Sequence, residues 1–110
     1  MFVGSVPRIA GKQSERTRIV DADPGAKVTL ECKMYGQAGI ILNWFTMNQK
    51  IKESANIEIS KSANDDDSVS FLILKNVTMN ENGLLYECRG QYPGVENLYE
   101  TQTILLRVGG

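Results

Sequence analysis

Histidine is absent from this chain of 110 residues, and cysteine and tryptophan are scarce, with two and one copies respectively. Without an imidazole, a Ser-His-Asp triad and histidine-based acid–base chemistry are excluded. Two cysteines fall short of the four thiolate or imidazole ligands of a structural zinc site, although they suffice for one disulfide bond. No nucleophile-with-base arrangement or phosphate-binding loop occurs either, so we expect a protein that is not an enzyme.

An excess of charge of one sign is also missing, because the formal net charge is −1. Nucleic acids and anionic membranes attract a surplus of Lys and Arg, so the balance argues against both as partners. No run reaches the roughly 20 apolar residues that span a bilayer. The opening MFVGSVPRIAGKQ has neither the charged nor the apolar region of a signal peptide. We expect no membrane insertion, no cofactor, no metal and no small-molecule substrate.

The length fits one domain, residues 1–110, with a core from about residue 7 to residue 108. Hydrophobic residues make up 42% and charged residues 23%, which is ordinary for a globular fold. The chain ends in Gly109-Gly110, which fits a linker. We expect the domain to be one piece of a longer, multidomain protein.

Apolar and polar residues alternate along most of the chain, and turn residues interrupt the alternation at short intervals. In KVTLECKMY, for example, Leu30 and Cys32 point one way while Thr29 and Glu31 point the other. Later segments repeat this pattern and predict Leu42, Leu72, Leu74, Ile104 and Leu106 as further core residues. The pattern predicts an all-β sandwich of two antiparallel sheets with seven to nine short strands.

Four residues have a spacing that is informative together: Cys32, Trp44, Tyr86 and Cys88. They occur in the stretches GAKVTLEC, LNWF and NGLLYEC, with LILKNVT between the last two. From about residue 7 to residue 108 the chain resembles the immunoglobulin superfamily, most closely its intermediate (I-type) set. The resemblance implies that a Cys32–Cys88 disulfide ties the two sheets together, that Trp44 packs against it, and that Tyr86 closes the corner before its strand.

One stretch departs from the family pattern Asp-x-Gly-x-Tyr-x-Cys. In ENGLLYEC two residues, not one, separate Gly83 from Tyr86. Either Glu81 takes the acidic role with an extra residue before Tyr86, or Asn82 takes it and Gly83 leaves the register. We favour the extra residue, absorbed in a bulge or a wider turn, because Tyr86 and Cys88 then stay on one face.

The compartment is open at this stage. A disulfide would indicate an extracellular or cell-surface domain, whereas two buried thiols would resemble the intracellular muscle modules of the superfamily. The sequon Asn76-Val77-Thr78 is a candidate N-glycosylation site in the turn before Tyr86. The acidic run NDDDS at 64–68 lacks the spacing of a calcium loop, so we interpret it as a solvated turn.

A binding surface is predicted on the outward face of the sheet that carries Trp44 and Cys88, together with the loop GQYPGVENLYE. In that loop we expect Tyr92 and Val95 to be exposed contacts, and Leu98 and Tyr99 to pack down. The alternative is an ordinary surface and a long hairpin, since about half of any protein surface is apolar. The predicted contact residues are Ile41, Phe45, Leu85, Arg89, Tyr92, Val95 and Leu105.

Two functions follow from these interpretations. The first is a recognition module of a cell-surface receptor, adhesion protein or secreted binding protein, whose partner is another protein in a homophilic or heterophilic contact. The second is a structural spacer in an intracellular muscle or filament-associated protein, with reduced cysteines and an unmodified Asn76.

Overall fold

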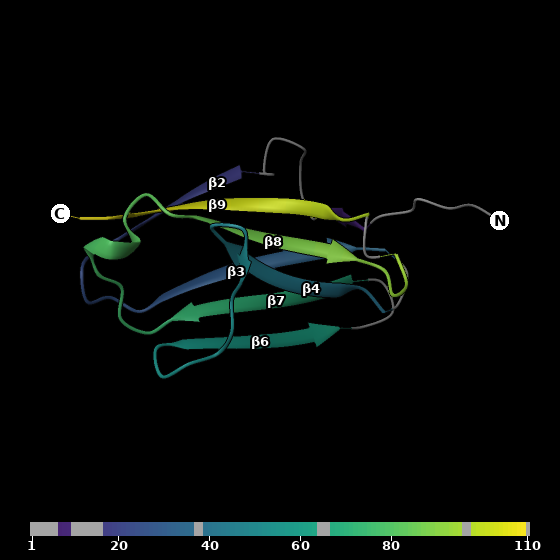
Figure 1. Ribbon diagram of the computed structural model, residues 1–110, viewed down its shortest axis with the longest axis horizontal. Coiled ribbons are helices and arrows are strands. Elements are labelled where there is room, and N and C mark those ends of the chain that lie inside the picture. The colour runs from purple at the N-terminus through teal and green to yellow at the C-terminus, as the bar shows by residue number, and fades with distance from the viewer. Residues whose placement is uncertain (1–6, 10–16, 37–38, 64–66, 96–97, 110) are drawn as a thin grey trace.

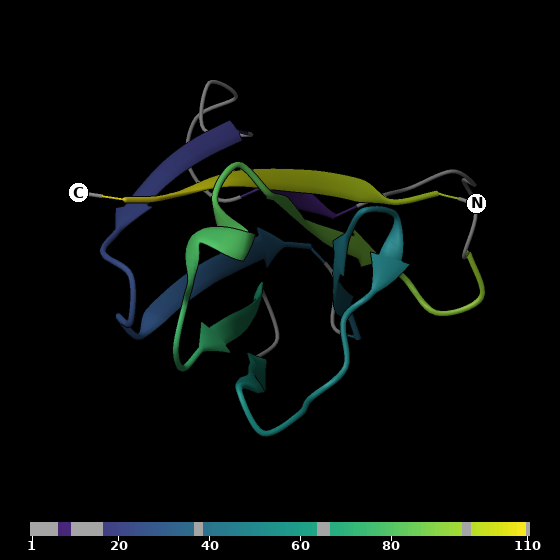
Figure 2. The same ribbon diagram turned by 60° about the vertical axis from the view of Figure 1, so that its left-hand side comes forward.

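A computed structural model describes residues 7–9, 17–36, 39–63, 67–95 and 98–109. The described residues form nine strands in two sheets, of four and five strands, which pack face to face (Figures 1 and 2). The predicted all-β sandwich is therefore confirmed. No helix among the described residues has the length and hydropathy required to cross a membrane.

The four-stranded sheet is antiparallel throughout, and its spatial order is β1-β3-β7-β6. Its strands are β1 (Arg8–Ile9), β3 (Val28–Tyr35), β7 (Asp67–Leu74) and β6 (Ile57–Ala63). The edge strand β6 has β7 as its strand partner and is largely exposed. In β3 and β7 alternate side chains are buried, as the sequence pattern predicts.

The five-stranded sheet has the order β2-β9-β8-β4-β5 and is mixed. Its strands are β2 (Thr17–Ala22), β9 (Glu100–Val108), β8 (Leu85–Gln91), β4 (Ile41–Thr46) and β5 (Gln49–Lys50). β2 runs parallel to β9, and the other neighbours are antiparallel. In Figure 2 the purple-blue strand β2 and the yellow strand β9 lie in the same layer.

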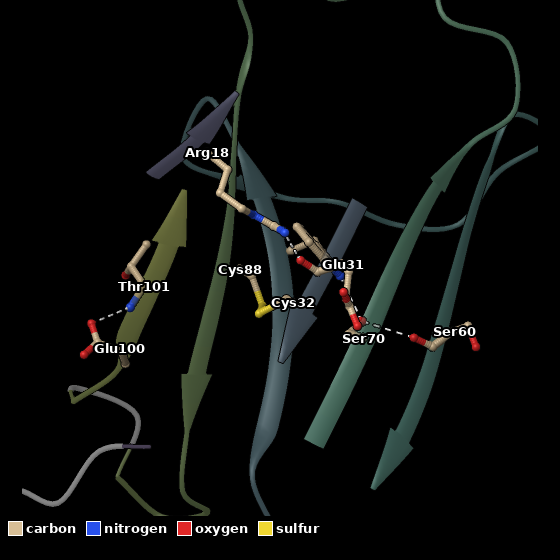
Figure 3. The surroundings of a disulfide bond; sticks show 9 residues. Arg18, Glu31, Cys32, Ser60, Ser70, Cys88, Glu100 and Thr101 are labelled. Atoms are coloured by element: carbon tan, nitrogen blue, oxygen red, sulfur yellow. Dashed lines mark hydrogen bonds between the residues drawn. A yellow bond between two sulfur atoms is a disulfide. The ribbon is translucent and has the colours of Figure 1, made fainter. Parts of the chain in front are cut away.

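The core lies between the sheets around a disulfide that joins Cys32 of β3 to Cys88 of β8, with a Cα–Cα distance of 6.3 Å (Figure 3). Trp44 is buried beside it, and its indole Nε1 donates to Ser70 Oγ at 2.9 Å. Ser70 in turn donates to the Ser60 carbonyl at 3.2 Å. This relay gives the indole N–H and the Ser70 hydroxyl hydrogen-bond partners, which buried polar groups require. The predicted core residues are all buried: Leu30, Leu42, Leu72, Leu74 and Tyr86.

The departure from the family pattern before Tyr86 is accommodated by a short 3₁₀ helix, η2 (Met79–Glu81). Thr78 caps this helix: its hydroxyl accepts from the Asn80 amide, and the Glu81 carboxylate accepts from the Thr78 amide. Gly83 then takes a φ of 84°, which favours glycine, and its amide donates to the Leu106 carbonyl at 2.8 Å. The pairing of β8 with β9 resumes at Leu85, so Tyr86 and Cys88 both face inward.

Candidate protein-binding surface

The outward side of β9, β8 and β4 is a continuous face, and we call it the β9-β8-β4 face. Each of its strands alternates buried and partly exposed residues, because the inward positions supply Trp44, Cys88 and Ile104 to the core. The residues of the face are Ile41, Asn43 and Phe45 of β4, Leu85, Glu87 and Arg89 of β8, and Thr101, Thr103 and Leu105 of β9.

Arg89 lies at the centre of this face and contacts four neighbours. Its guanidinium lies 4.0 Å from the centroid of the Phe45 ring and 5.0 Å from that of Tyr99. One of its nitrogens donates to Glu87 Oε1 at 2.8 Å and to Asn48 Oδ1 at 3.1 Å. A cation stacked on aromatic rings and paired with a carboxylate loses little freedom on binding, so the cluster is preorganised for recognition.

Strand register explains how these residues meet. Phe45 lies opposite Glu87 in the pairing of β4 with β8, and Arg89 lies opposite Thr101 in the pairing of β8 with β9. The Arg89 side chain is only 18% exposed, against 33% for Glu87. The ion pair is therefore partly shielded from solvent, which strengthens it relative to a fully exposed pair.

An apolar row crosses the same face next to the Arg89 cluster. Leu85 pairs with Leu105, and Leu105 pairs with Ile19 of β2. Leu85 is 51% exposed and Ile19 is 55% exposed, and the nearby turn residue Met47 reaches 75%. Exposed apolar side chains that lie side by side and are bordered by charges are typical of interaction surfaces.

The loop after β8 differs from its prediction. Tyr92 is partly buried and packs against the core, where a Cβ placed on Gly36 would come within 2.0 Å of the Tyr92 hydroxyl oxygen. Val95 is also only partly exposed. Leu98 and Tyr99, which we expected to pack down, are instead exposed to 39% and 44%. The expectation was wrong because Gly36 leaves room for the Tyr92 ring, whereas Tyr99 lies outside the core against Arg89.

Sequence reasoning identified Phe45, Leu85, Arg89 and Leu105, which the structure places on one face. Ile41 lies on the same face farther along β4, opposite Gln91. The prediction missed Ile19, Asn48 and Tyr99. Alternation along β2 gives Ile19 an outward position, so that signal was present, but the parallel pairing that brings it beside Leu105 has no local sequence signature.

The candidate glycosylation residue Asn76 is exposed between β7 and η2. Figure 1 places η2 at one end of the sandwich, whereas β8 ends and β9 begins at the other. A glycan on Asn76 would therefore leave the Arg89 cluster uncovered. Most of the acidic run 64–68 lies outside the described residues; Asp67 is described, and its Oδ2 lies 3.8 Å from Lys33 Nζ.

Three ionisable groups among the described residues have shifted pKa values: the pKa of Asp21 is lowered, and those of Arg107 and Tyr86 are raised. Arg107 donates to both carboxylate oxygens of Asp21, at 2.7 and 3.0 Å, and this hydrogen bonding holds the Asp21 pKa below its ordinary value. Burial raises the pKa of Tyr86 to about 12, and the negative charge of Glu81 acts in the same direction.

The two-sheet topology, the buried tryptophan and the disulfide define an immunoglobulin-like sandwich. The family model of the immunoglobulin domain matches residues 20–101, so the chain belongs to this family. No curated protein matches the chain.

Among solved structures, the chain is similar to a chain of the complex between Dpr2 Ig1-Ig2 and DIP-Theta Ig1-Ig3, with a TM-score of 0.77 and 18% identity over 94% of this chain and 32% of that one. It is also similar to the titin I-band fragment I67-I69, with a TM-score of 0.70 and 25% identity over 93% of this chain and 32% of that one. The chain is similar as well to the complex of titin M10 with an obscurin-like 1 Ig domain. The TM-score there is 0.65 and the identity 21%, over 84% of this chain and 86% of that one. The chain thus spans about a third of the first two matched chains.

Proposed function

We propose that this domain is a non-catalytic recognition module that binds another protein through the β9-β8-β4 face. The observation that carries the proposal is the Arg89 cluster beside the apolar row Ile19, Leu105 and Leu85. Arginine and aromatic side chains with restricted motion are the residue types that contribute most to protein interfaces. Two of the similar structures are complexes between immunoglobulin domains, which supports a protein partner.

We further propose an extracellular setting, as one domain of a receptor, adhesion protein or secreted binding protein. The disulfide supports this setting, because such bonds persist mainly in oxidising compartments. The exposed sequon at Asn76 supports it as well, since a glycan there would lie at the end of the sandwich opposite the Arg89 cluster. The alternative is a spacer module in a filament-associated protein, which the likeness to the titin fragment of several domains favours.

The proposal is tested by capturing partners from the source tissue with the domain and two variants. Leu85→Arg places a charge in the apolar row, and Arg89→Ala removes the centre of the cluster. The control is Thr29→Arg, because Thr29 is exposed on β3 in the opposite sheet. We expect both face variants to lose the captured protein by about tenfold or more, and the control to retain it.

Equal capture by all three proteins would overturn the proposed surface. A domain that captures nothing, together with free thiols on the native protein, would favour the spacer. Circular dichroism of each variant confirms that the sandwich is intact before capture is compared.

A further inference from the structure

A groove runs along one side of the sandwich, between the edge of β4 and the edge of β6. Two adjoining hollows of about 320 and 240 Å³ make up this groove, and both are lined by Leu42 and Lys61. Trp44 and Ile59 line the first hollow, and Ile40 and Ala63 line the second. The groove borders the β9-β8-β4 face at Asn43, which also lines the first hollow, but its other lining residues lie outside that face.

The groove exists because β5 is only two residues long. β5 pairs with Phe45 and Thr46, and one further bond joins the Ile51 amide to the Trp44 carbonyl at 2.8 Å. No strand among the described residues pairs with the preceding part of β4 on this side. Backbone groups alternate in direction along a strand, so Leu42 directs its amide and carbonyl to the same side as Trp44, into the groove.

On the opposite wall, β6 also has an outer edge without a strand partner among the described residues. The first part of this edge is satisfied locally: the Ile57 amide donates to the Ser54 carbonyl, and the Ile59 amide donates to Glu53 Oε2 at 3.0 Å. By the same alternation, Lys61 and Ala63 direct their backbone groups outward. The second part of the β6 edge is therefore a template to which an extended chain can pair.

The charged side chains around the groove indicate which kind of peptide it would bind. Lys50, Lys52 and Lys61 line the first hollow and are exposed. Glu53 is the one acidic residue of that lining, and its carboxylate is already occupied by the Ile59 amide. The rim therefore carries a local positive excess although the whole chain has a net charge of −1.

We propose that this groove binds an extended acidic peptide segment, which adds a strand to the outer edge of β6. Its backbone pairs with Lys61 and Ala63, its apolar side chains lie against Ile40 and Leu42, and its carboxylates face the three lysines. An added strand takes its affinity from main-chain bonds and its specificity from alternate side chains, which matches a groove whose edges lack a full strand partner among the described residues and whose rim is charged.

The test titrates the isotope-labelled domain with a blocked peptide of alternating glutamate and valine, about seven residues long, the length of an ordinary strand. We expect the amide chemical shifts of Leu42, Lys61 and Ala63 to change during the titration. At saturation, hydrogen exchange of the Lys61 and Ala63 amides should slow by about tenfold, because both become hydrogen-bonded. The same peptide N-methylated at alternate residues lacks the donors and should not bind.

The contribution of the lysines is tested with Lys61→Glu, which should lower the affinity of the domain for the peptide by about fivefold. Lys27→Glu is the matched control, because Lys27 is an exposed lysine outside the groove and should leave the affinity unchanged. Unchanged exchange at Lys61 and Ala63, shifts on the β9-β8-β4 face instead, or equal binding of the N-methylated peptide would each overturn the proposal. The result is independent of the capture experiment, since the two surfaces share no tested residue.

Discussion

Met47 combines a long side chain with a positive φ, a backbone region that favours glycine and asparagine. Met47 and Asn48 form the turn between β4 and β5 with φ angles of 50° and 60°. Asn tolerates this left-handed region, whereas a long side chain there costs about 1 kcal/mol. We expect Met47→Asn to raise the free energy of unfolding by about that amount in urea titrations.

Met79→Asn is the control, because Met79 is also an exposed methionine but is not among the residues with positive φ. It should bring no gain in stability. If Met47→Asn is neutral or destabilising, the turn does not hold the strain described. Because Met47 lies beside the apolar row, we also expect the stabilised variant to capture less partner, as when a strained residue is kept for function.

Tyr86 makes the free energy of unfolding fall at alkaline pH. Its folded-state pKa is about 12, above the ordinary value of 10.0, so the phenol ionises more easily in the unfolded chain. The stabilisation of the folded state by the neutral Tyr86 phenol is therefore fully present below pH 10, and it is lost as the pH rises towards 12. We expect Tyr86→Phe to flatten the fall in stability over this interval in urea titrations at several pH values. A slope equal to that of the unmodified domain would contradict the assignment.

Among the elements, η2 depends on Thr78. The hydroxyl of Thr78 and the carboxylate of Glu81 together satisfy the free amides at the start of the helix. We expect Thr78→Ala to lower the free energy of unfolding by about 1 kcal/mol, measured by urea titration of unglycosylated protein. Thr78→Ser keeps the cap and the sequon and should stay within a few tenths of a kcal/mol of the original. An equal loss in both variants would contradict the capping role.

Elements with strict alternation were predictable from the sequence, and the others were not. The inward faces of β3, β7, β8 and β9 followed directly from period-2 patterns, because one face of each strand is buried. η2 was missed, since its capping signature spans only a few residues and the extra residue before Tyr86 was assigned to a bulge or a wider turn. The contacts of Arg89 with Phe45 and Tyr99 join two strands and the loop before β9, and single-strand patterns carry no information about side-chain direction across a face.

At the scale of the whole molecule, the disulfide between the sheets closes a long loop, with a sequence separation of 56. In the chain-entropy model such a loop closure stabilises the folded state by about 4 kcal/mol. We expect the Cys32→Ala/Cys88→Ala double variant to lose a large part of its stability, with a lower urea midpoint and an unchanged circular dichroism spectrum before unfolding. An unchanged midpoint would show that packing around Trp44 alone holds the two sheets together.

The account depends most on an oxidised sandwich whose outer face is free for a partner. The most direct measurement is peptide mapping, by mass spectrometry under non-reducing conditions, of the protein isolated from its native source with its thiols blocked. The account predicts a single peptide pair linked through Cys32 and Cys88, with no blocked thiol at either position, and a glycan mass on the peptide that contains Asn76. Two blocked thiols and an unmodified Asn76 would contradict it and would indicate the spacer.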